Sequence, residues 1–219
     1  MKGLLIKNVQ LTVSNKRLIL IVVGVAALML VMGSGTTTFI TGYVTLIFAF
    51  QVLTTITYDE YDHSSAFLMT MPITRSMYTI EKNVFALLST AIGWAASMGG
   101  FSIYNAFAVP AVQWDEWLAG GFSVLMVALV LLAVSIPVQL KFGGENGRIV
   151  VAAIIVVCVI LAFVTGKLLA SINVDIDLLI ESVFVTDRML FWPCFAVIIA
   201  VLYLISMMFS MRIVKRKEY

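Results

Sequence analysis

The first half of this chain is interrupted by one long polar stretch, YDEYDHSSAFLMTMPITRSMYTIEK, which runs from Tyr58 to Lys82. Hydrophobic runs of membrane-spanning length lie on both sides of it. The stretch carries clustered charges, one proline and a central apolar patch. The side of the membrane on which it lies therefore decides how the rest of the chain is arranged.

The composition is that of an integral membrane protein. Hydrophobic residues make up 62% of the 219 residues and charged residues 12%, and the mean hydropathy is +1.07. Soluble globular domains have about half apolar and about a quarter charged residues. Each helical span needs about 20 residues, so the chain has room for about five to seven spans and for no separate soluble domain.

The hydrophobic runs predict six spans within a single all-α transmembrane domain. The predicted spans cover residues of about 18–32, 36–57, 83–109, 117–140, 149–165 and 190–211. The boundaries follow the hydropathy of the runs and the polar residues between them.

A short helix along the membrane surface is expected before the first span, over residues 2–15. The spacing of its residues divides it into an apolar and a polar face. The apolar face comprises Leu5, Ile6, Val9 and Val13, and the polar face comprises Lys7, Gln10 and Ser14.

The distribution of basic residues orients the six spans. An even number of spans places both termini, the Tyr58–Lys82 stretch and the loop of residues 141–148 on one side. All but two of the 14 Lys and Arg residues lie on that side, and only Lys167 and Arg188 lie on the other. Because Lys and Arg are concentrated in cytoplasmic loops, the polar stretch and both termini are predicted to be cytoplasmic.

The cytoplasmic stretch is predicted to contain a short helix, a break and the start of the third span. Pro72 disfavours helix at the residue before it and cannot continue one, and Thr74 can cap the helix that follows. The short helix would expose a tip formed by Phe67, Leu68 and Met69. An exposed apolar tip either contacts lipid or docks into the groove of a partner, and the residues alone favour neither.

A pattern in this stretch, D-E … F-L-x-T-x-P-I-T-R … Y … E-K, resembles the permease subunits of the ABC-2 type exporter family. The surface helix and the six spans strengthen the resemblance. The chain looks most like small permeases that export amphipathic peptides, such as phenol-soluble modulin exporters and lantibiotic-immunity transporters. The residues of the pattern are Asp59, Glu60, Phe67, Leu68, Thr70, Pro72, Ile73, Thr74, Arg75, Tyr78, Glu81 and Lys82.

The resemblance implies that about residues 60–72 form a coupling helix, which inserts into a cleft of a separate ATP-binding subunit. The apolar tip would be buried there, and charged residues would lie at its rim. The residues expected to couple the subunits are Glu60, Asp62, Phe67, Leu68, Met69, Pro72 and Arg75. The resemblance therefore favours docking to a partner over contact with lipid.

The same resemblance implies short helices that partly re-enter the membrane in the last external segment. Ile172, Ile176, Leu179 and Val183 recur there at helical spacing. Residues of about 171–185 fit such an element, and a plain external loop is the alternative.

The second predicted span carries a row of mildly polar residues. They are Thr37, Thr41, Thr45, Gln51 and Thr55. Small polar residues allow helices to pack closely. The other interpretation is that this row lines an amphipathic pathway between two permeases.

The chain is predicted not to be an enzyme. It has no G-x-x-x-x-G-K-[ST] phosphate-binding loop. His63 is the only histidine, which excludes paired-histidine metal sites within one chain. The six runs contain no Asp, Glu, Lys or Arg, which ion-driven carriers usually retain. No cofactor is expected in this chain, and ATP and Mg would be bound by the partner ATPase.

The sequence therefore predicts the permease subunit of an exporter in the cell membrane, bacterial by its resemblance. It would move amphipathic peptides or other hydrophobic substrates out of the cytoplasm or the membrane. The expected partners are cytoplasmic ATPase subunits, a second copy or a related permease, the substrate and membrane lipid, without nucleic acid. A non-transporting scaffold or immunity protein that binds a partner is the alternative.

Overall fold

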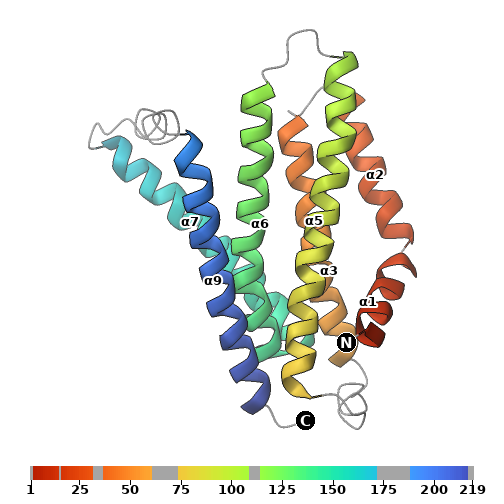
Figure 1. Ribbon diagram of the computed structural model, residues 1–219. Coiled ribbons are helices and arrows are strands. Elements are labelled where there is room, and N and C mark those ends of the chain that lie inside the picture. The colour runs from red at the N-terminus through yellow and green to blue at the C-terminus, as the bar shows by residue number, and fades with distance from the viewer. Residues whose placement is uncertain are drawn as a thin grey trace.

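The computed structural model describes residues 2–14, 16–31, 37–60, 74–108, 114–171 and 188–216, and all of these except Thr74 and Gly143 lie in α-helices. The described residues form seven helices (Figure 1). They are α1 (Lys2–Ser14), α2 (Lys16–Val31), α3 (Thr37–Glu60), α5 (Arg75–Ala108), α6 (Trp114–Phe142), α7 (Gly144–Ser171) and α9 (Arg188–Arg216). The predicted all-α fold is confirmed for this part of the chain.

The predicted surface helix and each of the six predicted hydrophobic runs correspond to one of these helices, but most of the helices are longer than the runs. α5 begins at Arg75 and not at residue 83. Its early start is explained by Thr74, whose hydroxyl oxygen accepts a hydrogen bond from the Met77 amide at 3.2 Å. This bond confirms the predicted N-cap. Hydropathy marks the apolar part of a helix, whereas capping decides where the helix begins.

The predicted loop of residues 141–148 is reduced to a break at one residue. α6 ends at Phe142 and α7 begins at Gly144, and Gly143 between them has a φ of +81°. The Gly143 amide donates to the Gln139 carbonyl at 2.9 Å, as in helices that end on a left-handed residue. Because glycine adopts this backbone conformation without steric cost, two long helices are joined by a very short connection.

Four of the described helices, α3, α5, α6 and α9, are long and apolar enough to cross a membrane. α1 and α2 pass the same test as a pair bent by 55°, and α7 contains a shorter apolar helix over Asn146–Val157. The described residues therefore contain four candidate spans, or five if the bent pair counts as one. The six-span arrangement stays a prediction.

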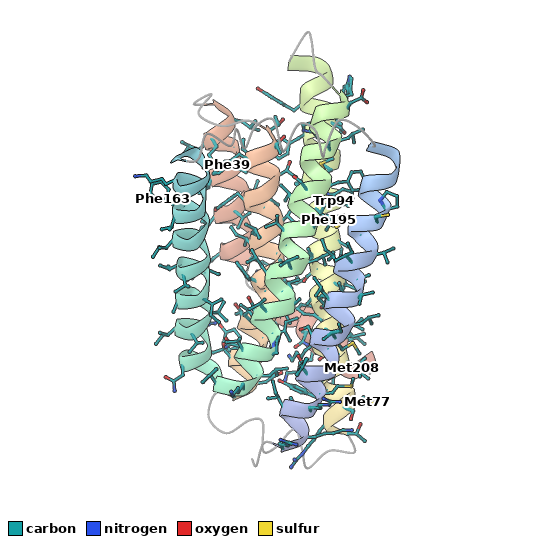
Figure 2. All side chains as sticks on the ribbon, turned by 90° about the vertical axis from the view of Figure 1, so that its left-hand side faces the viewer. Phe39, Met77, Trp94, Phe163, Phe195 and Met208 are labelled. Carbon is teal, nitrogen blue, oxygen red and sulfur yellow. The ribbon has the colours of Figure 1, made fainter. Side chains whose placement is uncertain are left out.

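The outside of the bundle is apolar. Phe39, Phe163, Phe195 and Met208 are among the large apolar side chains that lie on its surface (Figure 2). Soluble proteins rarely expose apolar surface on this scale. The surface is that of a protein surrounded by lipid.

α3 organises the interior of the bundle. It packs against α5 and α6, and α9 packs against the same two helices. Ile56, Leu132, Ile136 and Val214 are completely buried in the larger of two apolar clusters. The start of α1 and the end of α9 both lie toward the lower end of the bundle in Figure 1.

Gly93 permits the close approach of α5 to α3. A Cβ atom at Gly93 would lie 2.5 Å from Cβ of Phe48, so no larger residue fits without moving the backbone of α3 away from α5. Trp94, the next residue, donates its indole N–H to the carbonyl of Gly121 in α6 at 2.7 Å. Small residues at helix crossings let backbones approach closely in membrane proteins. This short stretch of α5 therefore holds three helices together.

We expect Gly93→Ala to destabilise the protein by about 1–3 kcal/mol, the usual cost of overpacking. Gly99→Ala is the matched control, because a methyl group added at this position of the same helix would have no atom within 4 Å. It should be neutral or stabilising by up to about 1 kcal/mol through helix propensity. Thermal unfolding in detergent measures the difference, and equal melting temperatures for the two variants would contradict this role of Gly93.

Candidate functional site

The predicted docking tip lies in the segment of residues 61–73, which connects the end of α3 to the start of α5. Glu60 is the last residue of α3 and Arg75 the first of α5. The remaining predicted coupling residues lie outside the described residues: Asp62, Phe67, Leu68, Met69 and Pro72.

Glu60 and Arg75 both contact other helices of the same chain. A Cβ atom at Gly143 would lie 2.8 Å from Glu60 Oε2, so this carboxylate lies against the connection between α6 and α7. Arg75 Nη1 donates to the Lys215 carbonyl near the end of α9 at 2.9 Å. The two ends of the segment are thereby attached to the bases of three further helices.

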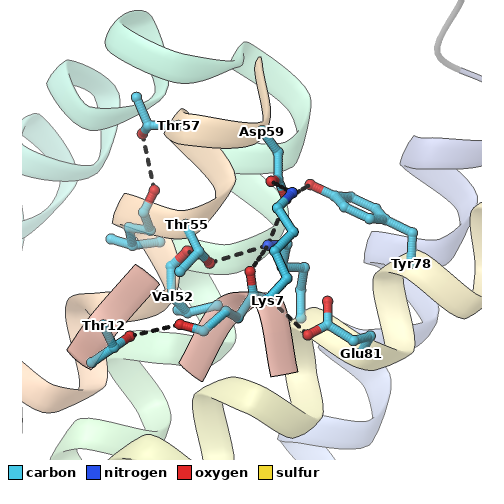
Figure 3. Close-up of polar contacts among 11 residues, drawn as sticks. Lys7, Thr12, Val52, Thr55, Thr57, Asp59, Tyr78 and Glu81 are labelled. Atoms are coloured by element: carbon cyan, nitrogen blue, oxygen red, sulfur yellow. Dashed lines mark hydrogen bonds and ion pairs between the residues drawn. The ribbon is translucent and has the colours of Figure 1, made fainter. Parts of the chain in front are cut away.

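A buried ion pair between α3 and α5 lies beside these ends (Figure 3). Lys82 Nζ is 2.6 Å from Asp59 Oδ2, and the two side chains are only 1% and 2% exposed. Asp59 Oδ1 is 2.5 Å from Lys7 Nζ of α1. The Tyr78 hydroxyl donates to Asp59 Oδ2 at 3.2 Å. One carboxylate therefore joins three helices.

Asn8 of α1 extends this arrangement. Asn8 Nδ2 donates to Glu81 Oε1 at 2.6 Å, and Lys82 Nζ donates to Asn8 Oδ1 at 3.2 Å. Lys82 Nζ also donates to Thr55 Oγ1 at 3.2 Å, so its three acceptors match its three N–H donors. We call the following set the charge network: Lys7, Asn8, Thr55, Asp59, Tyr78, Glu81 and Lys82.

The charge network contains two ammonium groups and two carboxylates, and its formal charge is zero. Burial of a charge in a membrane protein is costly unless the charge is paired, and a buried pair also needs its remaining hydrogen bonds satisfied. Asp59 meets this condition through three donors. Glu81 Oε2 is buried and has no hydrogen-bond partner among the described residues. Removal of Asp59 would leave the buried Lys82 ammonium without its counter-ion.

The charge network determines which side of α1 meets the protein. Leu4 and Asn8 are buried against the bundle, whereas Ile6, Val9 and Val13 are each more than half exposed. The sequence predicted an apolar and a polar face for this helix but not which face packs on the bundle. Because Lys7 and Asn8 find partners inside the bundle, much of the apolar face is left without close contacts in the chain.

The predicted pathway residues of α3 lie inside the chain. Thr41 and Thr45 are completely buried, and their hydroxyls donate to carbonyls one turn earlier in α3, at 2.9 and 2.7 Å. Gln51 and Thr55 are buried as well, and Thr37 is partly buried at the start of the helix. This geometry is that of close helix packing, and the assignment of these residues to a pathway stays a prediction.

The other predictions concern the re-entrant helices of the last external segment and the absence of a metal site. Ile172, Ile176, Leu179 and Val183, expected in re-entrant helices, lie outside the described residues. Within the described ranges, no group of three or more His, Cys, Asp or Glu residues is arranged to hold a metal ion.

Sequence reasoning included Asp59, Glu81 and Lys82 in a family pattern but did not pair them, and it placed Lys7 on the polar face of the surface helix. The predicted third span began one residue after Lys82, so Lys82 was not counted among the charges inside a span. The sequence did contain one indication of the Asp59–Lys82 pair, because these two residues flank the segment between two consecutive helices. The ends of consecutive antiparallel helices lie close together, which brings such residues within reach of each other.

We expect Asp59→Leu to lower the free energy of unfolding by about 3–5 kcal/mol, because it leaves the Lys82 ammonium buried without its counter-ion. The double variant Asp59→Leu/Lys82→Met removes both charges and should regain most of the lost stability. The measurement is thermal unfolding in detergent. Asp115→Asn, at an exposed position of α6, serves as the control and should change little. Equal loss in the single and double variants would show that the pair is not coupled.

Comparison with known proteins agrees with the predicted family. A family model described as ABC-2 family transporter protein matches residues 3–215, which include nearly all of the described helices. No curated protein and no solved structure matches the chain. The likeness to phenol-soluble modulin and lantibiotic-immunity permeases stays a prediction. The match spans nearly the whole sequence, and the chain therefore belongs to the ABC-2 transporter family.

Proposed function

We propose that this chain is the permease subunit of an ATP-driven exporter and that a separate ATPase docks on residues 60–75. Family membership supports a transmembrane, non-catalytic subunit that works with an ABC ATPase. The observation that carries the proposal is the charge network, which joins both ends of the docking segment to α1 through buried groups.

The charge network provides a mechanical reason for this assignment. Asp59 lies one residue before the end of α3, and Lys82 lies within the first turns of α5. Separating a buried pair of this kind costs about 3–5 kcal/mol, so a force applied to the segment moves both helices together. Because Lys7 and Asn8 of α1 bind Asp59, Glu81 and Lys82, α1 would move with α3 and α5. A displacement of the docking segment is therefore transmitted to three helices at once.

The apolar tip of the segment supplies the docking contact in this proposal. Phe67, Leu68 and Met69 would enter a groove of the ATPase, in the way that apolar anchors commonly enter grooves. Glu60 and Arg75 already contact other helices of this chain. Their role would be to attach the ends of the segment to the bundle, with the tip left to bind the partner.

The proposed cargo is an amphipathic peptide or another hydrophobic molecule. The surface of the bundle is apolar, and in the described helices other than α1 the charges lie toward the helix ends rather than midway along them. A second permease, identical or related, would complete the pathway. We further propose that the chain crosses the membrane six times. Both termini and the docking segment would then lie in the cytoplasm.

The docking role of the tip can be tested with matched charge insertions. Phe67→Glu/Leu68→Glu should weaken ATPase association by about tenfold or more, as expected when an apolar hot spot is lost. Ser64→Glu/Ser65→Glu adds the same charge to the same segment outside the tip and should retain association. The measurements are copurification with the ATPase and stimulation of ATP hydrolysis by the permease.

Unchanged association and stimulation in the tip variant would refute docking through these residues. A chain that copurifies with no ATPase from its own cells would instead favour a non-transporting scaffold or immunity protein.

The proposed topology can be tested separately. In a background lacking Cys158 and Cys194, Ala111→Cys should react with a membrane-impermeant maleimide in intact cells. Ser65→Cys should react only after the membrane is permeabilised, because residues 58–82 are predicted to be cytoplasmic. Labelling of both positions in intact cells would contradict the six-span orientation.

A further inference from the structure

An apolar pocket of about 310 Å³ lies on the inner side of the bend between α1 and α2. Figure 1 shows these two helices at the side of the bundle, meeting at an angle. The pocket is bounded by α1 and α2 on one side and by α3 and α5 on the other. Its walls include Leu5, Val9, Ile19, Phe48, Phe85 and Ile92.

The polar groups in the walls are satisfied by the protein itself. Thr12 and Ser89 carry the hydroxyls that line the pocket. Thr12 donates to the Asn8 carbonyl at 3.0 Å and Ser89 to the Ala86 carbonyl at 3.1 Å. No hydroxyl proton is left for a ligand in this part of the structure, so the walls suit a hydrocarbon chain. The volume is at the lower end of the range for small-molecule pockets, which fits one chain better than a bulky molecule.

Two basic residues lie at the start of α2, two and three positions before Ile19 of the pocket wall. Lys16 and Arg17 begin α2 at the bend, and both are exposed. The first acidic residue of the whole sequence is Asp59, and it is paired within the charge network. Adjacent basic residues at the membrane surface attract anionic lipid headgroups. An apolar pocket and exposed cations therefore occur together on one bend.

We propose that this bend binds an anionic phospholipid, with one acyl chain in the pocket and the phosphate at Lys16 and Arg17. The lipid would be a resident ligand and not the transported cargo. It would fill the space between α1 and the bundle, next to the helix that supplies Lys7 and Asn8 to the charge network. The inference does not depend on the proposed ATPase partner.

The test compares two tryptophan substitutions on α1. Val9 lines the pocket, whereas Ile6 is a similarly exposed aliphatic residue of the same helix outside the lining. Wild type, Val9→Trp and Ile6→Trp are reconstituted in phosphatidylcholine nanodiscs with a minor fraction of phosphatidylglycerol. They are then released into detergent and examined by native mass spectrometry. Wild type and Ile6→Trp should retain one phosphatidylglycerol per chain, and Val9→Trp should lose it.

A charge variant tests the headgroup contact without altering the pocket. Lys16→Gln/Arg17→Gln should reduce the preference for phosphatidylglycerol over phosphatidylcholine by about tenfold, because each basic residue near an anionic surface strengthens binding severalfold. Both positions are exposed, so the fold should be unaffected. The proposal is overturned if wild type retains no lipid, if Val9→Trp retains as much as Ile6→Trp, or if the charge variant keeps the wild-type preference.

Discussion

A lysine ammonium group that is removed from water needs acceptors on every N–H, and in this protein Lys82 obtains all of them from other helices. Asp59 and Thr55 of α3 and Asn8 of α1 supply the three acceptors. Since an α-helix has 3.6 residues per turn, a rotation by one residue turns a side chain by about 100° and would break each of these contacts. The charge network therefore fixes the rotation of α1, α3 and α5 as well as their positions. The close crossing at Gly93 fixes the same pair, α3 and α5, farther along their length.

These constraints suggest how a member of this family could transmit movement. A transmembrane subunit that receives energy from a separate ATPase needs a stiff connection between the docking site and its spans. In this chain the described residues on both sides of residues 61–73 contact several other helices: Glu60 lies against the α6–α7 connection, Arg75 bonds to α9, and the charge network reaches α1. The contacts at this end are specific and hold the helices stiffly. The apolar side chains on the outside of the bundle, in contrast, can contact any lipid chain.

The order of the helices and most of their bounds could be predicted from the sequence, because long apolar runs report directly on burial in a membrane. The cap at Thr74 was predictable as well, since it depends on residues three positions apart. The charge network was not predicted, because its contacts join residues 19 to 74 positions apart in the sequence. Such contacts depend on how helices are rotated against each other. A helix that is apolar on nearly all sides has no clear polar face in its sequence, so the sequence does not specify this rotation. The one-residue break at Gly143 was predicted as a longer loop for a related reason, because polar composition does not distinguish a loop from a helix end.

The position of the charge network along the chain also bears on how the protein is assembled in the membrane. Lys7 and Asn8 are synthesised before their partners. Asp59 follows near the end of α3, and Glu81 and Lys82 follow in α5. Until α3 and α5 have both been inserted, α1 lacks the buried partners of its polar side chains. Its lysine then remains at the level of the lipid headgroups, where water and phosphate solvate it. We therefore expect the N-terminal helix, the first of the three to be made, to be the last to reach its final position.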